Sequence, residues 1–121
     1  MKTIITILSL IVITNFAFAQ KATQANIKVY GNCAMCKKRI ETALDTKGIK
    51  QATWDSKTKE LVVVYLPSKI SEMDIHNLVA SVGHDTDKVK AKDDVYADLP
   101  FCCLYRDHDH STVKDSGHGH H

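Results

Sequence analysis

The chain has 121 residues, of which 25% are charged, and its formal net charge is +2 with neutral histidines. This balance gives no strongly basic surface of the kind that binds nucleic acid, and the length allows one small domain with a modest core. The charge is uneven, since residues 20–90 hold twelve basic and eight acidic side chains, whereas residues 91–121 hold three basic and six acidic ones.

Residues 1–19 have the pattern of a cleavable export signal. A positive start precedes an apolar run over residues 4–13, and Ala-Phe-Ala at residues 17–19 fits the small-x-small cleavage rule. The run is shorter than the ~20 residues of a membrane-spanning helix, which argues against an uncleaved anchor. We therefore expect a periplasmic or otherwise exported protein that is not inserted in a membrane after cleavage. In such an oxidising compartment the four cysteines can form disulfides, for which three pairings exist.

The first half of the mature chain predicts a strand, a helix and a hairpin. Residues 25–30 alternate as a half-buried strand does, and from Cys33 the period changes to that of an amphipathic helix, which Gly48 ends. Residues 49–54 and 61–66 flank a polar turn and predict two strands. The first of these strands alternates poorly, which indicates a bulge or a position at the edge of the sheet.

The second half predicts one more helix and one more strand. Ser71 begins the helix, with Asp74 three residues later as an approximate capping box, and Gly83 ends it. Residues 87–91 are expected to form the last short strand. This order predicts an α+β, ferredoxin-like βαββαβ sandwich, in which two helices cover one face of a four-stranded antiparallel sheet.

The expected organisation has four parts. The parts are a signal peptide (1–19), a ferredoxin-like domain (20–91), a docking extension with a cysteine pair (92–106) and a disordered histidine-rich tail (107–121).

Cys33 and Cys36 are three residues apart at the predicted start of the first helix. This spacing puts both sulfurs on one side of the first turn, where unsatisfied N–H groups and the helix dipole stabilise thiolates. Two thiolates suit a soft cation: Cu(I) fits best, Hg(II) and Cd(II) also fit, and Zn(II) prefers four ligands. The same pair would also serve as a redox dithiol or form a structural disulfide. The hairpin that follows the helix favours metal binding over a thioredoxin-like arrangement.

These residues resemble a known family. The motif CAMC, the segment GIKQATWDSKTKELVVVY and the later VGHDTDKVKA are similar to the heavy-metal-associated domain. That family includes copper chaperones, metal domains of copper-transporting P-type ATPases and periplasmic mercury-binding proteins. The resemblance covers residues 25–91. It implies a ferredoxin-like fold, binding of a soft metal by Cys33 and Cys36, and transfer of the ion to a partner by ligand exchange.

The chain departs from the family pattern at two places. The family usually has Gly-Met-Thr before its first cysteine, whereas Tyr-Gly-Asn stands there at residues 30–32. The methionine that normally supports the metal loop is therefore missing, and we expect Tyr30 to fill its packing role. His84 stands where the family usually has an aromatic residue or a lysine close to the metal. His84 is thus a candidate auxiliary ligand, and the alternative is an exposed loop histidine.

Cys102 and Cys103 are adjacent, so their side chains diverge in an extended chain and chelate one ion poorly unless the backbone turns. Pro100 favours such a turn. We expect the segment to fold back, so that one or both thiolates reach the ion at Cys33 and Cys36. A disulfide, either between the two neighbours or to the domain, is the alternative.

The tail alternates histidine and aspartate, a composition that suits Cu(II), Ni(II) or Zn(II). Ordering a flexible tail costs entropy, so this site would be weak, and a solvated tail with incidental affinity is the alternative. The candidate ligands are His108, His110, His118, His120 and His121.

The sequence therefore predicts a non-enzymatic, exported metal-binding protein, a Cu(I) chaperone or scavenger. The alternatives are a periplasmic mercury-binding protein, a thiol-disulfide redox protein that uses the same cysteine pair, and a structural adaptor with two disulfides. The expected partner is a membrane metal transporter or another metal-binding protein, which the basic residues Lys37, Lys38 and Arg39 would contact. A transient dimer bridged by one metal ion is also consistent with the pattern.

Overall fold

An antiparallel three-stranded sheet forms the base of the molecule. The computed structural model describes residues 21–107, and the strand order in the sheet is β1-β3-β2. The strands are β1 (Thr23–Lys28), β2 (Ile49–Trp54) and β3 (Glu60–Tyr65). The central position of β3 agrees with its run of β-branched residues, which pack well on a pleated surface.

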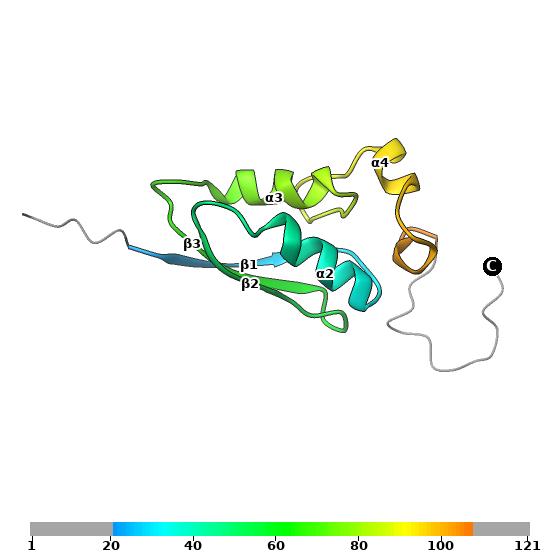
Figure 1. Cartoon of the computed structure of the whole chain (residues 1–121), viewed down its shortest axis with the longest axis horizontal. Helices are drawn as coiled ribbons and strands as arrows, with labels where there is room; N and C mark the ends of the chain where they lie inside the picture. Colours follow the sequence, from blue (N-terminus) through cyan, green and yellow to red (C-terminus); the bar gives the residue numbers. More distant parts are fainter. Residues whose placement is uncertain (1–20, 108–121) are drawn as a thin grey trace, which may run out of the picture.

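Two helices cover one face of this sheet (Figure 1). They are α2 (Ala34–Ala43) and α3 (Glu72–Ser81). A short helix, α4 (Asp93–Ala97), and a 3-10 turn, η2 (Phe101–Cys103), follow at one end of the molecule, where η2 contacts α2. In the described part of the chain, no helix has the length and apolar character that a membrane crossing requires.

Two details of the predicted elements are confirmed. The side chain of Ser71 accepts a hydrogen bond from the backbone N–H of Asp74, and the Asp74 carboxylate accepts one from the Ser71 N–H, which completes the capping box. Strand β2 lies at an edge of the sheet, and its register against β3 shifts between Ile49 and Gln51. The weak alternation of this strand therefore reflects both a bulge and an edge position.

The prediction of a fourth strand at residues 87–91 is wrong, since these residues form no strand in the structure. The side chain of Thr86 accepts hydrogen bonds from the N–H groups of Lys88 and Val89, at 3.1 and 3.0 Å. The Thr86 N–H also donates to the Val89 carbonyl, at 2.8 Å. This tight turn uses groups that a strand would pair with β1, and only an isolated bridge between Val29 and Thr86 remains.

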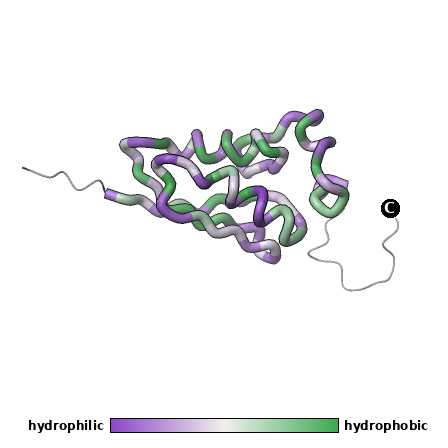
Figure 2. The backbone as a smooth tube through the Cα atoms, viewed as in Figure 1, coloured by the Kyte–Doolittle hydropathy of each residue, from purple (hydrophilic) through white to green (hydrophobic). Residues whose placement is uncertain are grey.

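The core lies between the sheet and the two helices. Figure 2 shows hydrophobic positions recurring along the helices and strands, and polar positions at the turns between them. The fully buried apolar residues of the core include Val29, Ile40, Leu61, Val63, Ile75 and Val79. Tyr96, Leu99 and Cys103 belong to the same buried cluster, so residues 92–107, here called the C-terminal segment, pack against the domain.

Candidate metal centre

The loop before α2 runs close to the core. A Cβ atom on Gly31 would lie 3.0 Å from Cη2 of Trp54 and 3.1 Å from Cβ of Cys36. No side chain fits in this space without a shift of its neighbours. The absence of a side chain at residue 31 therefore lets the loop approach the sheet closely and sets the start of α2.

Trp54 supports this loop, in place of the Tyr30 that sequence reasoning had favoured. Trp54 is 1% exposed and its Nε1 donates a hydrogen bond to the Val29 carbonyl at 2.9 Å, whereas the side chain of Tyr30 is 41% exposed. Tyr30 therefore cannot fill the packing role of the missing methionine. The buried ammonium group of Lys59 donates to the Gly31 carbonyl and holds the loop from the hairpin turn that precedes β3.

Cys33 and Cys36 lie at the beginning of α2. Cys33 is the N-cap residue and is half-buried, while Cys36 lies in the first turn and is fully buried. Their sulfurs are 3.6 Å apart, and the backbone N–H of Asn32 donates to the sulfur of Cys36 at 3.3 Å. The spacing on the helix thus brings the two sulfurs to one side, next to the positive end of the helix dipole.

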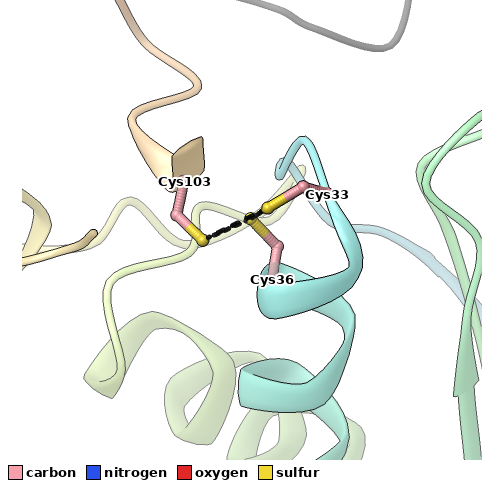
Figure 3. Close-up of side chains that lie close together, drawn as sticks. All are labelled: Cys33, Cys36 and Cys103. Atoms are coloured by element: carbon pink, nitrogen blue, oxygen red, sulfur yellow. Dashed lines mark hydrogen bonds between the residues drawn. The ribbon is translucent and has the colours of Figure 1, made fainter. Parts of the chain in front are cut away.

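The C-terminal segment brings two more sulfurs to this place. The sulfur of Cys102 lies 3.0 Å from that of Cys33, and the sulfur of Cys103 lies 2.7 Å from that of Cys36. Figure 3 shows the side chains of Cys33, Cys36 and Cys103 pointing toward one another. These three sulfurs lie within 4.8 Å of one another and form a group that could hold a metal ion.

The pKa values of these thiols are shifted in different directions. Burial raises the pKa of Cys33, but hydrogen bonds with the Cys102 thiol and with the backbone of Cys36 and Met35 outweigh it, and the pKa falls to about 7. The hydrogen bond with Cys33 raises the pKa of Cys102, and burial raises that of Cys103. Cys33 therefore supplies a thiolate near neutral pH, which is the form that binds soft metals.

The C-terminal segment is held in place by an anchor that consists of Tyr105 and Arg106. The Tyr105 hydroxyl donates to the Gly83 carbonyl and accepts from the Asp85 N–H, both at 2.7 Å. The guanidinium group of Arg106 forms two hydrogen bonds with the Asp85 carboxylate and a third with the Ala91 carbonyl. Sequence reasoning missed this anchor, because only the pairing across the fold distinguishes these two residues from other polar side chains.

His84 and His76 are buried and lie outside the sulfur group. His84 Nδ1 donates to the Tyr30 carbonyl at 2.8 Å, so its buried Nε2 carries a lone pair without a hydrogen-bond partner. Burial lowers the pKa of His84 to about 4 despite this hydrogen bond. His84 is therefore neither an exposed loop residue nor part of the sulfur group, the two expected arrangements. It is a neutral histidine in the core. His76 contacts the Thr86 hydroxyl at 2.5 Å.

The predicted signal peptide and the histidines of the predicted tail fall in the two terminal parts of the chain. Residues 1–20 and 108–121 lie outside the described residues, and so do the predicted weak ligands of the tail. These ligands are His108, His110, His118, His120 and His121.

Comparisons with known proteins agree with this geometry. Residues 32–85 match the family model of the heavy-metal-associated domain. The structure is similar to that of the CopZ metallochaperone, with a TM-score of 0.51 and 26% sequence identity over 53% of this chain and 98% of that one. A copper binding domain from HMA7, a P-type ATPase, gives a TM-score of 0.51 and 26% identity over 53% of this chain and 89% of that one.

Oxidized MerP from Ralstonia metallidurans shares the fold, with a TM-score of 0.52 and 19% identity over 55% of this chain and 96% of that one. No curated protein sequence gives a match. Cys33 and Cys36 lie inside the segment that matches the family, whereas Cys102 and Cys103 lie beyond its end.

Proposed function

Residues 32–85 match the family model of the heavy-metal-associated domain, and from this match we propose that the chain is an exported, non-catalytic protein that binds Cu(I) and passes it to a partner. Cys33 and Cys36 bind the ion. Transfer proceeds by stepwise exchange of thiolate ligands, in which the partner's thiolate bonds to the ion before one of the two cysteines leaves. The oxidation state of the ion does not change, so no electron acceptor is needed.

The observation that carries this proposal is the placement of Cys33 and Cys36 on the first turn of α2. Their sulfurs are 3.6 Å apart, and the pKa of Cys33 falls to about 7. Soft thiolate ligands prefer soft cations, and Cu(I) is such a cation. The similarity to a copper binding domain from HMA7, a P-type ATPase, at 26% identity supports the choice of copper.

A membrane transporter of the P-type ATPase class is the partner that fits this function. The similarity to a copper binding domain from such an ATPase supports this assignment. Lys37 is engaged within the molecule, because its ammonium group lies 2.6 Å from the Glu41 carboxylate and 3.0 Å from the Trp54 carbonyl. Docking of an acidic partner surface therefore depends mainly on Lys38 and Arg39.

A competition titration tests the metal assignment. The reduced protein is titrated with Cu(I) against a chromophoric chelator, and with Hg(II) and Zn(II) in parallel. We expect the double variant Cys33→Ser/Cys36→Ser to lose tight Cu(I) binding, and Cys102→Ser/Cys103→Ser to lose less. If the first variant keeps the affinity of the wild type while the second loses it, the primary site is not the pair on α2.

Export is tested separately, because the residues that predict it lie outside the described part of the chain. The full-length gene product is recovered from cell fractions, and its first residue is determined by mass spectrometry. We expect a chain that begins at Gln20 in the exported fraction. A chain that retains residues 1–19 in the cytoplasm would contradict export while leaving the metal assignment intact.

A further inference from the structure

We propose that the C-terminal segment is part of the metal site, with Cys103 as a third ligand and Cys102 as a fourth. The ion is then enclosed by three or four thiolates from two separate parts of the chain. This inference rests on the proposed function, because it takes Cys33 and Cys36 as the primary ligands. It raises the number of thiolates around the ion from two to three or four. It also identifies the C-terminal segment as a part of the chain that must move before the ion can leave.

The first argument is the distance between sulfurs of the two parts. Metal–sulfur bonds of about 2.3 Å in a tetrahedral site place the sulfurs about 3.8 Å apart. Three pairs come close to this value: Cys33 and Cys36 at 3.6 Å, Cys33 and Cys103 at 3.8 Å, and Cys102 and Cys103 at 3.9 Å. The pairs Cys33–Cys102 and Cys36–Cys103 are closer, at 3.0 and 2.7 Å, and would have to widen by roughly 1 Å around an ion.

The second argument is local backbone structure. In an extended chain the side chains of two adjacent cysteines point in opposite directions. In this chain Pro100 precedes the 3-10 turn η2, whose Cys103 N–H donates to the Pro100 carbonyl at 2.8 Å. Successive side chains in such a turn are about 120° apart, so both sulfurs can face the start of α2. Cys103 is fully buried against Cys36, while Cys102 lies 3.4 Å from the Met35 sulfur at the outer side.

The third argument is that contacts on both sides fix the position of Cys102 and Cys103. On the N-terminal side, Leu99 is 6% exposed and packs on Gly83, where an added Cβ would lie 2.9 Å from the leucine Cδ2. On the C-terminal side, the anchor of Tyr105 and Arg106 bonds to Gly83 and Asp85. A segment fixed at both flanks presents its two sulfurs without a further loss of backbone entropy, and such preorganisation favours ion binding.

The consequence concerns selectivity and release. A site with two thiolates suits a cation of low coordination number, whereas three or four thiolates also suit Cd(II) and Zn(II). Cys103 is fully buried and Cys102 is half-buried, so the C-terminal segment lies against the pair and a partner's thiolate that approaches from solvent meets Cys102 first. Ligand exchange with a partner then requires either replacement of Cys103 or displacement of the C-terminal segment.

Cd(II) is the probe for the experiment, because its thiolate charge-transfer absorption grows with the number of bound sulfurs. The reduced full chain is titrated as wild type, Cys103→Ser, Cys102→Ser and Cys33→Ser/Cys36→Ser, and circular dichroism confirms that each variant folds. We expect Cys103→Ser to lose roughly a quarter to a third of the absorption per bound ion. We also expect its Cd(II) affinity to fall at least about tenfold.

The anchor gives a second, independent test. Tyr105→Phe removes the hydroxyl that bonds to Gly83 and Asp85, and Tyr65→Phe removes a hydroxyl from a buried tyrosine of β3 as a matched control. We expect Tyr105→Phe to speed transfer of bound Cd(II) to a chelator, and Tyr65→Phe to leave the rate unchanged. An equal rate for wild type and both variants would show that the segment does not enclose the ion.

The results separate this inference from the proposed function. Full absorption and affinity in both Cys102→Ser and Cys103→Ser, together with loss of binding in Cys33→Ser/Cys36→Ser, would overturn the inference and leave the proposed function standing. Tight binding by the last variant would overturn the proposed function. Disulfides from Cys33 to Cys102 and from Cys36 to Cys103 that resist mild reduction would also overturn the inference.

Discussion

Arg106 and Asp85, which are 21 residues apart in the sequence, form a two-point ion pair. Nε of Arg106 lies 3.1 Å from one carboxylate oxygen of Asp85, and one terminal nitrogen lies 2.8 Å from the other. The two side chains are only 21% and 17% exposed, so solvent screens the pair less than it does most surface pairs. The pair joins the C-terminal segment to the loop that follows α3.

Replacement of Arg106 by Gln should release the C-terminal segment. Hydrogen bonds to a charged group contribute about 1.5–3 kcal/mol, and the Asp85 carboxylate would lose two of them. Burial raises the pKa of Asp85 while the hydrogen bonds of Arg106 lower it, so this pKa should rise in the variant.

Two measurements check this prediction. Hydrogen exchange should become faster in residues 92–107, and an NMR titration should show the higher pKa of Asp85. Lys50→Gln, on the exposed side of β2, is the control and should change neither measurement. Unchanged protection of residues 92–107 in Arg106→Gln would contradict a role of the ion pair in docking.

The buried His84 should make the protein less stable in mild acid. Burial lowers its pKa from 6.5 to about 4, so the unfolded chain takes up a proton between these values and the folded chain does not. The stability linked to this histidine is fully present above pH 6.5 and falls as the pH drops toward 4, by up to about 3 kcal/mol. His76, whose pKa is also lowered by burial, adds to the same trend.

Denaturant unfolding at several pH values, on wild type and on His84→Asn, isolates this contribution. The asparagine side chain can still donate to the Tyr30 carbonyl, but it does not titrate. We expect the stability of the variant to depend less steeply on pH between 4 and 6.5. Equal slopes for both proteins would mean that His84 is protonated in the folded state.

Gly83 should be intolerant of a side chain. Its φ of +102° lies in a region that L-residues rarely adopt, and an added Cβ would meet Leu99 at 2.9 Å. Gly83→Ala should therefore cost about 1–3 kcal/mol and loosen the C-terminal segment. Gly48→Ala, with a φ of +96° near Ile70, carries the same backbone strain far from that segment.

Hydrogen exchange distinguishes the two alanine variants. In Gly83→Ala, residues 92–107 should lose protection more than the sheet does. In Gly48→Ala, the loss should be spread over the domain. The same pattern in both variants would contradict a specific contact between Gly83 and Leu99.

Trp54 should matter more to the metal loop than Tyr30. Trp54→Phe leaves the Val29 carbonyl without its hydrogen bond and removes part of the ring below Gly31, which should cost about 1–3 kcal/mol. Tyr30→Leu changes a side chain that is 41% exposed and should stay within about 0.5 kcal/mol of the wild type. Thermal unfolding followed by circular dichroism, together with Cu(I) titration, measures both effects. A larger loss in Tyr30→Leu would restore the role that the sequence favoured for Tyr30.

Local patterns predicted most of the secondary structure. The capping box at Ser71 and Asp74 and the bulge in β2 were predictable, because each depends on residues close together in sequence. The position of Cys33 and Cys36 at a helix start was predictable for the same reason. The fourth strand was not correctly predicted, since the hydroxyl of Thr86 takes two N–H groups that the strand needed.

Apart from the return of Cys102 and Cys103 to the first helix, long-range contacts could not be predicted from the sequence. Tyr30 and Trp54 are both aromatic, and only the folded hairpin decides which ring lies below Gly31. The return of Cys103 to Cys36 was predicted as an open alternative to a disulfide, and the structure brings the two sulfurs together. Its role as a metal ligand stays a prediction.

The contact between Cys103 and Cys36 links ion binding to docking of the C-terminal segment, because the two sulfurs belong to segments that can separate. An ion bound by both sulfurs would stabilise docking of the C-terminal segment. The docked segment would in turn raise the affinity for the ion by the same factor. A protein that captures the open segment would therefore weaken ion affinity without touching the helix that carries Cys36. Binding of the acceptor protein would then trigger release of the ion, and other metal-binding molecules in solution would obtain little of it.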